Sequence, residues 1–138
     1  MISLPPSPLK RAGWLFTFLW FLVGGLGHFA AADFFVSICP PWVPEPLLVV
    51  YVSGVIELLL TALLIPVPTR PLAGVALLAL IVAVTPANVW MLTQHDSQFA
   101  QFPVWLLWFR LVIQVALLAN VWWSTRQDAP DQRWSPST

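Results

Sequence analysis

The first long apolar stretch, "WLFTFLWFLVGGLGHFAAADFF" at residues 14–35, decides the fold because it carries no formal charge before Asp33. A helix needs about 20 mainly apolar residues to cross the hydrocarbon of a bilayer. Similar runs follow at 47–65, 72–92 and 104–123. Backbone polar groups must be satisfied within the chain in lipid, so long unbroken runs predict helices rather than barrel strands. We therefore expect an all-α membrane protein, a single domain over residues 1–138 built as a bundle of four transmembrane helices.

The composition supports a membrane protein and excludes several other classes. The chain is 59% hydrophobic and 9% charged and has nine tryptophans, whereas soluble domains average about 25% charged residues. The net charge of zero argues against a nucleic-acid partner. The single cysteine, Cys39, cannot form an internal disulfide or a cysteine-based metal site. We expect the lipid bilayer as the main partner, no metal, and no evident cofactor.

The basic residues predict the orientation of the bundle. They precede the first run, separate the second from the third, and follow the fourth: Lys10, Arg11, Arg70, Arg126 and Arg133. The other two connections contain no lysine or arginine. The positive-inside rule then places both termini in the cytoplasm, with residues 1–11 and 125–138 as flexible tails.

A signal peptide is a competing interpretation of the first run. "AAA" at residues 30–32 resembles a cleavage site that would release the chain before Asp33. The apolar stretch nevertheless continues through Phe34, Phe35 and Val36, which is long for a signal sequence. We favour a retained first helix.

Each predicted helix carries one strong polar side chain in what would be the outer half of the membrane. At about 1.5 Å of rise per residue, similar depths are reached by His28, Glu57, Asn88 and Arg110. Asp33, Ser53 and Gln114 are accessory candidates on the same helices. Polar and ionisable groups are costly in lipid and turn toward the bundle interior, so we expect these side chains to converge on one site.

Glu57 and Arg110 are expected to face each other, directly or through His28 or water. Opposite charges at reachable depths reduce the cost of burying each, which is about 3 kcal/mol per ionised residue at the bilayer centre. A purely structural role stays open, since a buried ion pair can serve to fix helix register.

The glycines of the first run predict how its histidine is placed. Gly24 and His28 share a helical face, and Gly24, Gly25 and Gly27 permit close helix packing, with Gly54 as the expected counterpart. His28 would then point toward Glu57 as a proton relay or ligand-holding pair. The alternative is a histidine that only hydrogen-bonds a neighbouring helix. His95 lies in an outer loop, too shallow to complete a bis-histidine haem site.

Three further residues have simpler expected roles. Asp33 is most simply a solvated carboxylate at a helix end, and the lone thiol of Cys39 is most simply inert. Pro86 should kink the third helix.

Several blocks of the sequence resemble the DoxX-type family of small bacterial four-helix membrane proteins. They are "HF" with "PPWVPEP" around the first outer loop, "YVSGVIELLL" in the second run, "PAN" in the third and "WLLWFRLVIQ" in the fourth. The resemblance covers residues 13–123. It implies a bacterial cytoplasmic (inner) membrane and a link to thiosulfate:quinone oxidoreduction or other thiol redox chemistry. The chain lacks the further cysteines that a dithiol relay would need.

These observations together predict a redox-associated membrane subunit. It would bind a quinone or another small apolar ligand at His28, Glu57, Asn88 and Arg110, and electrons would come from a membrane or redox protein partner. It could be a subunit of an oxidoreductase but carries no signature of a self-contained enzyme. A non-catalytic assembly or chaperone-like protein for a larger complex is the alternative. A small transporter subunit is the third, and it would require a homo-oligomer.

Overall fold

Four long helices make up the bundle. The computed structural model describes residue 5 and residues 7–126, so Arg133 and most of the predicted C-terminal tail lie outside the described residues. The helices are α1 (Pro8–Ala30), α2 (Ala32–Ser37), α3 (Pro46–Leu63), α4 (Arg70–Thr93), α5 (His95–Gln98) and α6 (Val104–Thr125). α1, α3, α4 and α6 are long and apolar enough to cross a membrane. No strand occurs in the described part of the chain, and the all-α four-helix membrane fold is confirmed.

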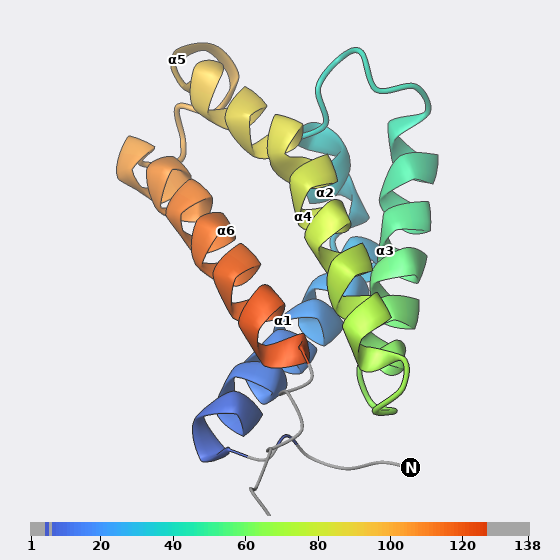
Figure 1. Ribbon diagram of the computed structural model, residues 1–138. Coiled ribbons are helices and arrows are strands. Elements are labelled where there is room, and N and C mark those ends of the chain that lie inside the picture. Colours follow the sequence, from blue (N-terminus) through green and yellow to red (C-terminus); the bar gives the residue numbers. More distant parts are fainter. Residues whose placement is uncertain (1–4, 6, 127–138) are drawn as a thin grey trace, which may run out of the picture.

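The four long helices form two packed pairs, α1 with α3 and α4 with α6 (Figure 1). α1 begins and α6 ends at the lower end of the bundle, where the pairs join. Toward the upper end α3 and α4 diverge (Figure 1). The short helix α2 packs on α3.

The first helix differs from the expected span of residues 14–35. It begins at Pro8, where the Ser7 side chain accepts a 3.2 Å hydrogen bond from the backbone N–H of Lys10 and proline occupies a favoured first position. Residues 8–11, expected in a flexible tail, are therefore helical. The helix is interrupted at Ala31 (φ −131°, ψ 41°), and the apolar run continues as α2. Continuous apolar sequence sets the length of a span but not where the chain bends.

Small residues hold α1 against α3, as the sequence predicts. A Cβ atom at Gly54 would lie 2.7 Å from the Cβ of His28, and one at Gly25 would lie 2.8 Å from the Leu58 side chain. Real Cβ atoms essentially never make such short contacts. Gly27 differs, because its nearest neighbour would be the Phe35 ring at 3.7 Å. Gly25 and Gly54 thus set the helix separation, whereas Gly27 does not.

Hydrogen bonds and a packed core close the lower half. The Asn120 side chain of α6 donates to the Gly13 carbonyl (3.0 Å) and to Thr17 Oγ1 (2.8 Å) of α1. The Trp14 indole N–H donates to the Leu64 carbonyl at the end of α3 (3.0 Å). Between the helices lies one cluster of buried residues: Phe21, Leu64, Ala73, Leu77, Ile81, Leu117 and Val121. Buried side chains therefore fill the space between the helices in the lower half.

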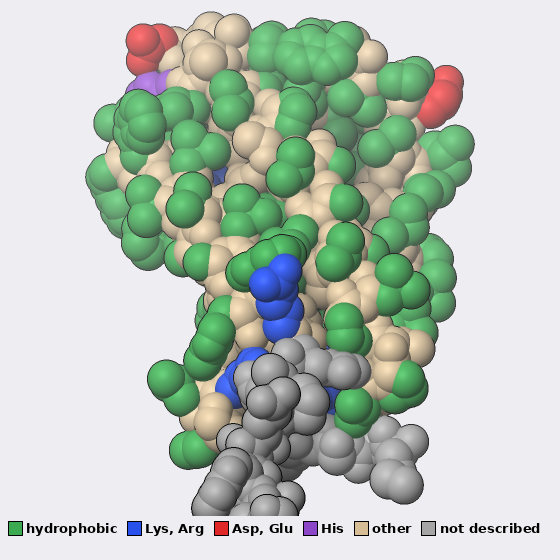
Figure 2. Space-filling model, viewed as in Figure 1, with side chains coloured by type: hydrophobic (Ala, Val, Ile, Leu, Met, Phe, Trp, Pro, Cys, Tyr) green, Lys and Arg blue, Asp and Glu red, His purple; other side chains and the backbone are tan. Residues whose placement is uncertain are grey.

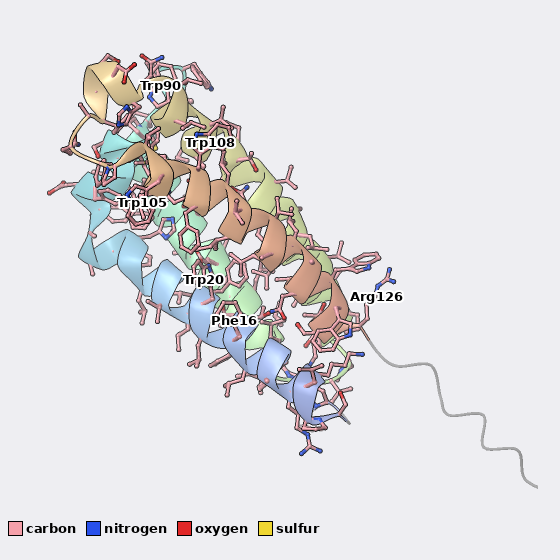
Figure 3. The ribbon with its side chains drawn as sticks, turned by 90° about the vertical axis from the view of Figure 1, so that its left-hand side faces the viewer. Phe16, Trp20, Trp90, Trp105, Trp108 and Arg126 are labelled. Carbon is pink, nitrogen blue, oxygen red and sulfur yellow. The ribbon has the colours of Figure 1, made fainter. Side chains whose placement is uncertain are left out.

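A second, smaller cluster covers the upper end. It consists of Ile38 in the loop after α2, Met91 of α4, Phe99 in the loop after α5 and Leu107 of α6. Beside it the Trp42 and Trp90 rings meet edge to face with centroids 5.3 Å apart. Trp90 and Arg126 lie at opposite ends of the molecule (Figure 3). Aromatic and basic side chains at these ends suit the two interfaces of a bilayer.

The glycine seam predicts opposite outcomes for two similar substitutions. Gly54→Ala should destabilise the protein by ~1–3 kcal/mol, because an added methyl group overpacks a tight interface. Gly27→Ala should be neutral or slightly stabilising, since alanine favours helix by about 1 kcal/mol and its Cβ meets only ordinary contacts. Unfolding of both variants in lipid nanodiscs measures the difference. Equal stabilities would show that the α1–α3 contact is not close.

Candidate functional site

A cavity of about 540 Å³ lies between the two helix pairs in the upper part of the bundle. His28, Glu57, Asn88 and Arg110, the residues that the sequence singles out, all line it. Most of the remaining wall is apolar, including Phe21, Ile81 and Leu117 at its lower side. Pockets of about 300–1,000 Å³ with few polar groups on apolar walls are typical of small-molecule sites. The four polar side chains therefore line one cavity.

The α1–α3 pair supplies a histidine and a carboxylate to one wall. His28 Nδ1 lies 3.5 Å from Glu57 Oε2, so the expected contact between these residues is present. The Glu57 carboxyl group lies against Gly24, and a Cβ at that position would collide with Oε1. The missing side chain of Gly24 therefore makes room for the carboxylate beside the histidine.

The His28 ring is fixed by contacts on two sides. Nδ1 lies 2.9 Å from the Gly24 carbonyl oxygen; because a carbonyl only accepts, Nδ1 carries the proton. The ring also stacks on Phe35 of α2, with centroids 4.2 Å apart and planes inclined by 18°. Neutral histidine then presents Nε2 as an acceptor, and no hydrogen bond to Nε2 occurs among the described residues.

The α4–α6 pair forms the other wall through a chain of amide hydrogen bonds. Asn88 accepts from Arg110 Nη2 (2.8 Å) and donates to Gln114 Oε1 (2.7 Å). Gln114 in turn donates to the Ile81 carbonyl (2.9 Å) and to Thr85 Oγ1. Each amide is used as both donor and acceptor, which fixes the orientation of the guanidinium group.

The Arg110 guanidinium makes one side-chain hydrogen bond, to Asn88, among the described residues. Its Nε is buried and has no hydrogen-bond partner. Of the contacts expected between Arg110 and Glu57, the direct ion pair does not occur among the described residues, because Asn88 binds the guanidinium and Glu57 contacts His28. A link through His28 or water stays a prediction. Each charge is held by its own helix pair, and the cavity lies between them. Because Arg110 lines the cavity, its guanidinium group can donate a hydrogen bond to an oxygen placed there.

The accessory candidates divide into two groups. Ser53 and Gln114 line the cavity, although the Ser53 hydroxyl donates only to the Val50 carbonyl of its own helix (2.8 Å). Asp33 does not belong to the site. It is exposed on α2 and does not line the cavity, because the break at Ala31 turns this short helix and leaves Asp33 on the outside.

Sequence reasoning missed two parts of the cavity wall. Phe35 reaches His28 only because α1 ends at Ala30, and a continuous helix would place it about 10 Å further along. Cys39 lines the cavity as well, and its thiol donates to the Phe35 carbonyl at 3.4 Å. Burial raises the pKa of the Cys39 thiol, so it lacks the thiolate character of a reactive cysteine. The alanines at residues 30–32 give no signal of the bend, because alanine is the strongest helix former.

His95 is placed in the upper connection and takes no part in the cavity. Nδ1 lies 2.8 Å from Asp96 Oδ1 and Nε2 lies 2.9 Å from the Phe102 carbonyl. These two acceptors raise the pKa of His95 above its ordinary value. Its contacts serve the connection between α4 and α6.

The two walls offer complementary chemistry to a bound molecule. Arg110 can donate a hydrogen bond to a carbonyl or hydroxyl oxygen, while His28 and Glu57 can accept a hydrogen bond or exchange a proton. The apolar wall between them suits a ring or chain. In the described part of the chain, no group of three histidine, cysteine or acidic residues is arranged to hold a metal ion.

Removal of Asn88 should weaken the α4–α6 wall. Asn88→Ala breaks the bonds to both Arg110 and Gln114, at a cost of ~0.6–2 kcal/mol for each interhelical bond in a membrane. Ser53→Ala is the matched control within the cavity and should change stability little, because its bond stays within one helix turn. Thermal unfolding in nanodiscs compares them. Equal losses would mean that the amide chain does not hold the wall.

The chain was also compared with known proteins. No curated protein and no solved structure matches it. The family described as Domain of unknown function (DUF8561) matches residues 18–125, which is more than half of the chain. The protein belongs to this family.

Proposed function

We propose that this protein is a DoxX-like integral membrane subunit that binds a quinone, or a similar small apolar molecule with polar oxygens, in the cavity between its helix pairs. The observation that carries the proposal is that the Arg110 guanidinium and the His28–Glu57 pair line one cavity and make no ion pair with each other. A molecule with an oxygen at each end of an apolar ring would satisfy both walls.

The proposed role is redox-associated rather than catalytic by itself. Arg110 would bind one ring oxygen and stabilise negative charge that develops on it, and His28 with Glu57 would deliver or accept a proton at the other. The electrons would have to come from a partner protein in the same membrane. The resemblance of residues 13–123 to DoxX-type proteins supports this association.

The packing favours ligand binding over the two alternatives. A transporter needs access from both faces, whereas buried Leu64, Leu77 and Val121 fill the space below the cavity. A purely structural lock needs a closed polar cluster, whereas Arg110 and Glu57 stand apart. An assembly role would rest on exposed aromatic side chains such as Trp105 and Trp108 of α6 (Figure 3), which lipid also accommodates.

We further propose that both termini lie in the cytoplasm of a bacterial cell. Lysine and arginine side chains gather toward the lower end of the molecule, and acidic side chains lie near the upper end (Figure 2). The positive-inside rule assigns the basic end to the cytoplasm. The cavity would then lie in the outer half of the inner membrane.

Ligand binding can be tested by native mass spectrometry of the protein released from nanodiscs. Wild type should retain a bound small molecule, and His28→Ala, Glu57→Gln and Arg110→Gln should each lose most of it. The loss of one charge-assisted hydrogen bond, about 1.5–3 kcal/mol, corresponds to a roughly 10- to 100-fold weaker affinity.

Asn120→Ala is the matched control, because Asn120 bonds α1 to α6 below the cavity. This variant should be less stable than wild type but should keep its ligand. If neither wild type nor any variant carries a bound molecule, and the cavity variants unfold, the polar cluster has a purely structural role.

The orientation can be tested with single cysteines in a Cys39→Ala background. Ser97→Cys in α5 should react with a membrane-impermeant maleimide on intact cells, whereas Pro68→Cys between α3 and α4 should react only after lysis. Both positions are exposed, so burial does not confound the comparison. The reverse pattern would place the termini outside.

A further inference from the structure

The cavity is open on one side, between the upper halves of α3 and α4. Several side chains that line it are also exposed on the outside of the bundle: Val49 of α3 (42%), Val84 of α4 (40%) and Trp42 of the loop between α2 and α3 (64%). α3 and α4 diverge in the same region (Figure 1). On the α6 side the lining residues Gln114 and Leu117 are buried. The α3–α4 side is therefore one opening of the cavity, while Trp20 of α1, which also lines the cavity, is 41% exposed.

This opening faces lipid rather than water. Val49 lies roughly 5 Å below the start of α3 and Val84 roughly 14 Å below the end of α4, at 1.5 Å per residue. These depths fall within the hydrocarbon of a bilayer. Above the opening, the Trp42–Trp90 pair separates it from the upper surface.

From this geometry we infer that the ligand is a membrane-dissolved amphiphile with a chain. Its polar head lies between His28–Glu57 and Asn88–Arg110, and its apolar chain leaves the cavity between Val49 and Val84 into the outer leaflet. The inference rests on the proposed function and adds the class of ligand and its route. A compact molecule enclosed by the cavity would not need an apolar opening at this depth.

Two probes that differ only in the chain test the inference: a benzoquinone with a decyl chain and the same ring without it. Tryptophan quenching in nanodiscs reports binding, since Trp20 and Trp42 line the cavity. Val84→Trp should block the opening and weaken binding of the decyl probe about tenfold, or ~1.4 kcal/mol. Val82→Trp is the matched control: Val82 is 59% exposed on α4 but does not line the cavity, so binding should stay unchanged.

Cys39 provides a second readout that needs no quinone binding. It is the only cysteine of the chain and lines the cavity. A pyrene maleimide dissolved in the bilayer should label it at alkaline pH, which compensates for the raised pKa of the partly buried thiol. Val84→Trp should slow the labelling about tenfold, the same factor as for binding, and Val82→Trp should not.

The outcomes separate this inference from the proposed function. Equal binding of both probes, or no effect of Val84→Trp on binding and labelling, overturns the chain-bearing ligand and its route but leaves a binding cavity. If neither probe binds but Val84→Trp still slows the labelling of Cys39, the ligand does not have a quinone-like head, whereas the opening to lipid is supported. Two results together support the inference. Val84→Trp, but not Val82→Trp, should weaken binding of the decyl probe, and wild type should bind the chainless ring more weakly than the decyl probe.

Discussion

The constraint on which the structure depends is that a bilayer offers no water to the polar side chains of its helices. Each such group must find a partner inside the protein or lose several kcal/mol of solvation free energy. The protein meets this constraint separately in each helix pair. Glu57 lies beside His28 in the α1–α3 pair, and Arg110 binds Asn88 in the α4–α6 pair. Because neither charge crosses the gap, the space between the pairs stays open.

Packing at the lower end holds the two helix pairs together, although a cavity separates them higher up. The Asn120 bonds to α1 and the buried core around Leu77 join the pairs where no cavity exists. The upper cluster of Ile38, Met91, Phe99 and Leu107 closes the far end. The cavity thus lies above the core cluster and below the upper cluster, with polar side chains from both helix pairs. The side between α3 and α4 is then a route to the bilayer. The proposed function rests on this arrangement, in which Arg110 and the His28–Glu57 pair line the same cavity.

The sequence predicts the fold well because four apolar runs of membrane-spanning length allow few other solutions. It also predicts that His28, Glu57, Asn88 and Arg110 converge, since each is too polar to face lipid. It does not predict which groups pair. Depth along a helix is readable from residue number, but Arg110 prefers Asn88 over Glu57 because of helix rotation and separation, which spacing alone does not fix. The bend at Ala31 has the same character, and the sequence does not predict the position of Phe35 that depends on it.

The separation of Arg110 from Glu57 is the central claim, and it can be measured directly. Rotational-echo double-resonance NMR in lipid, with the guanidinium nitrogens of Arg110 and the carboxyl carbon of Glu57 labelled, reports the distance between the two groups. We predict a weak coupling between Arg110 and Glu57, because the two side chains lie on different walls of the cavity and make no ion pair. A strong coupling, typical of a contact ion pair, would contradict it and would show that the polar residues form a closed lock.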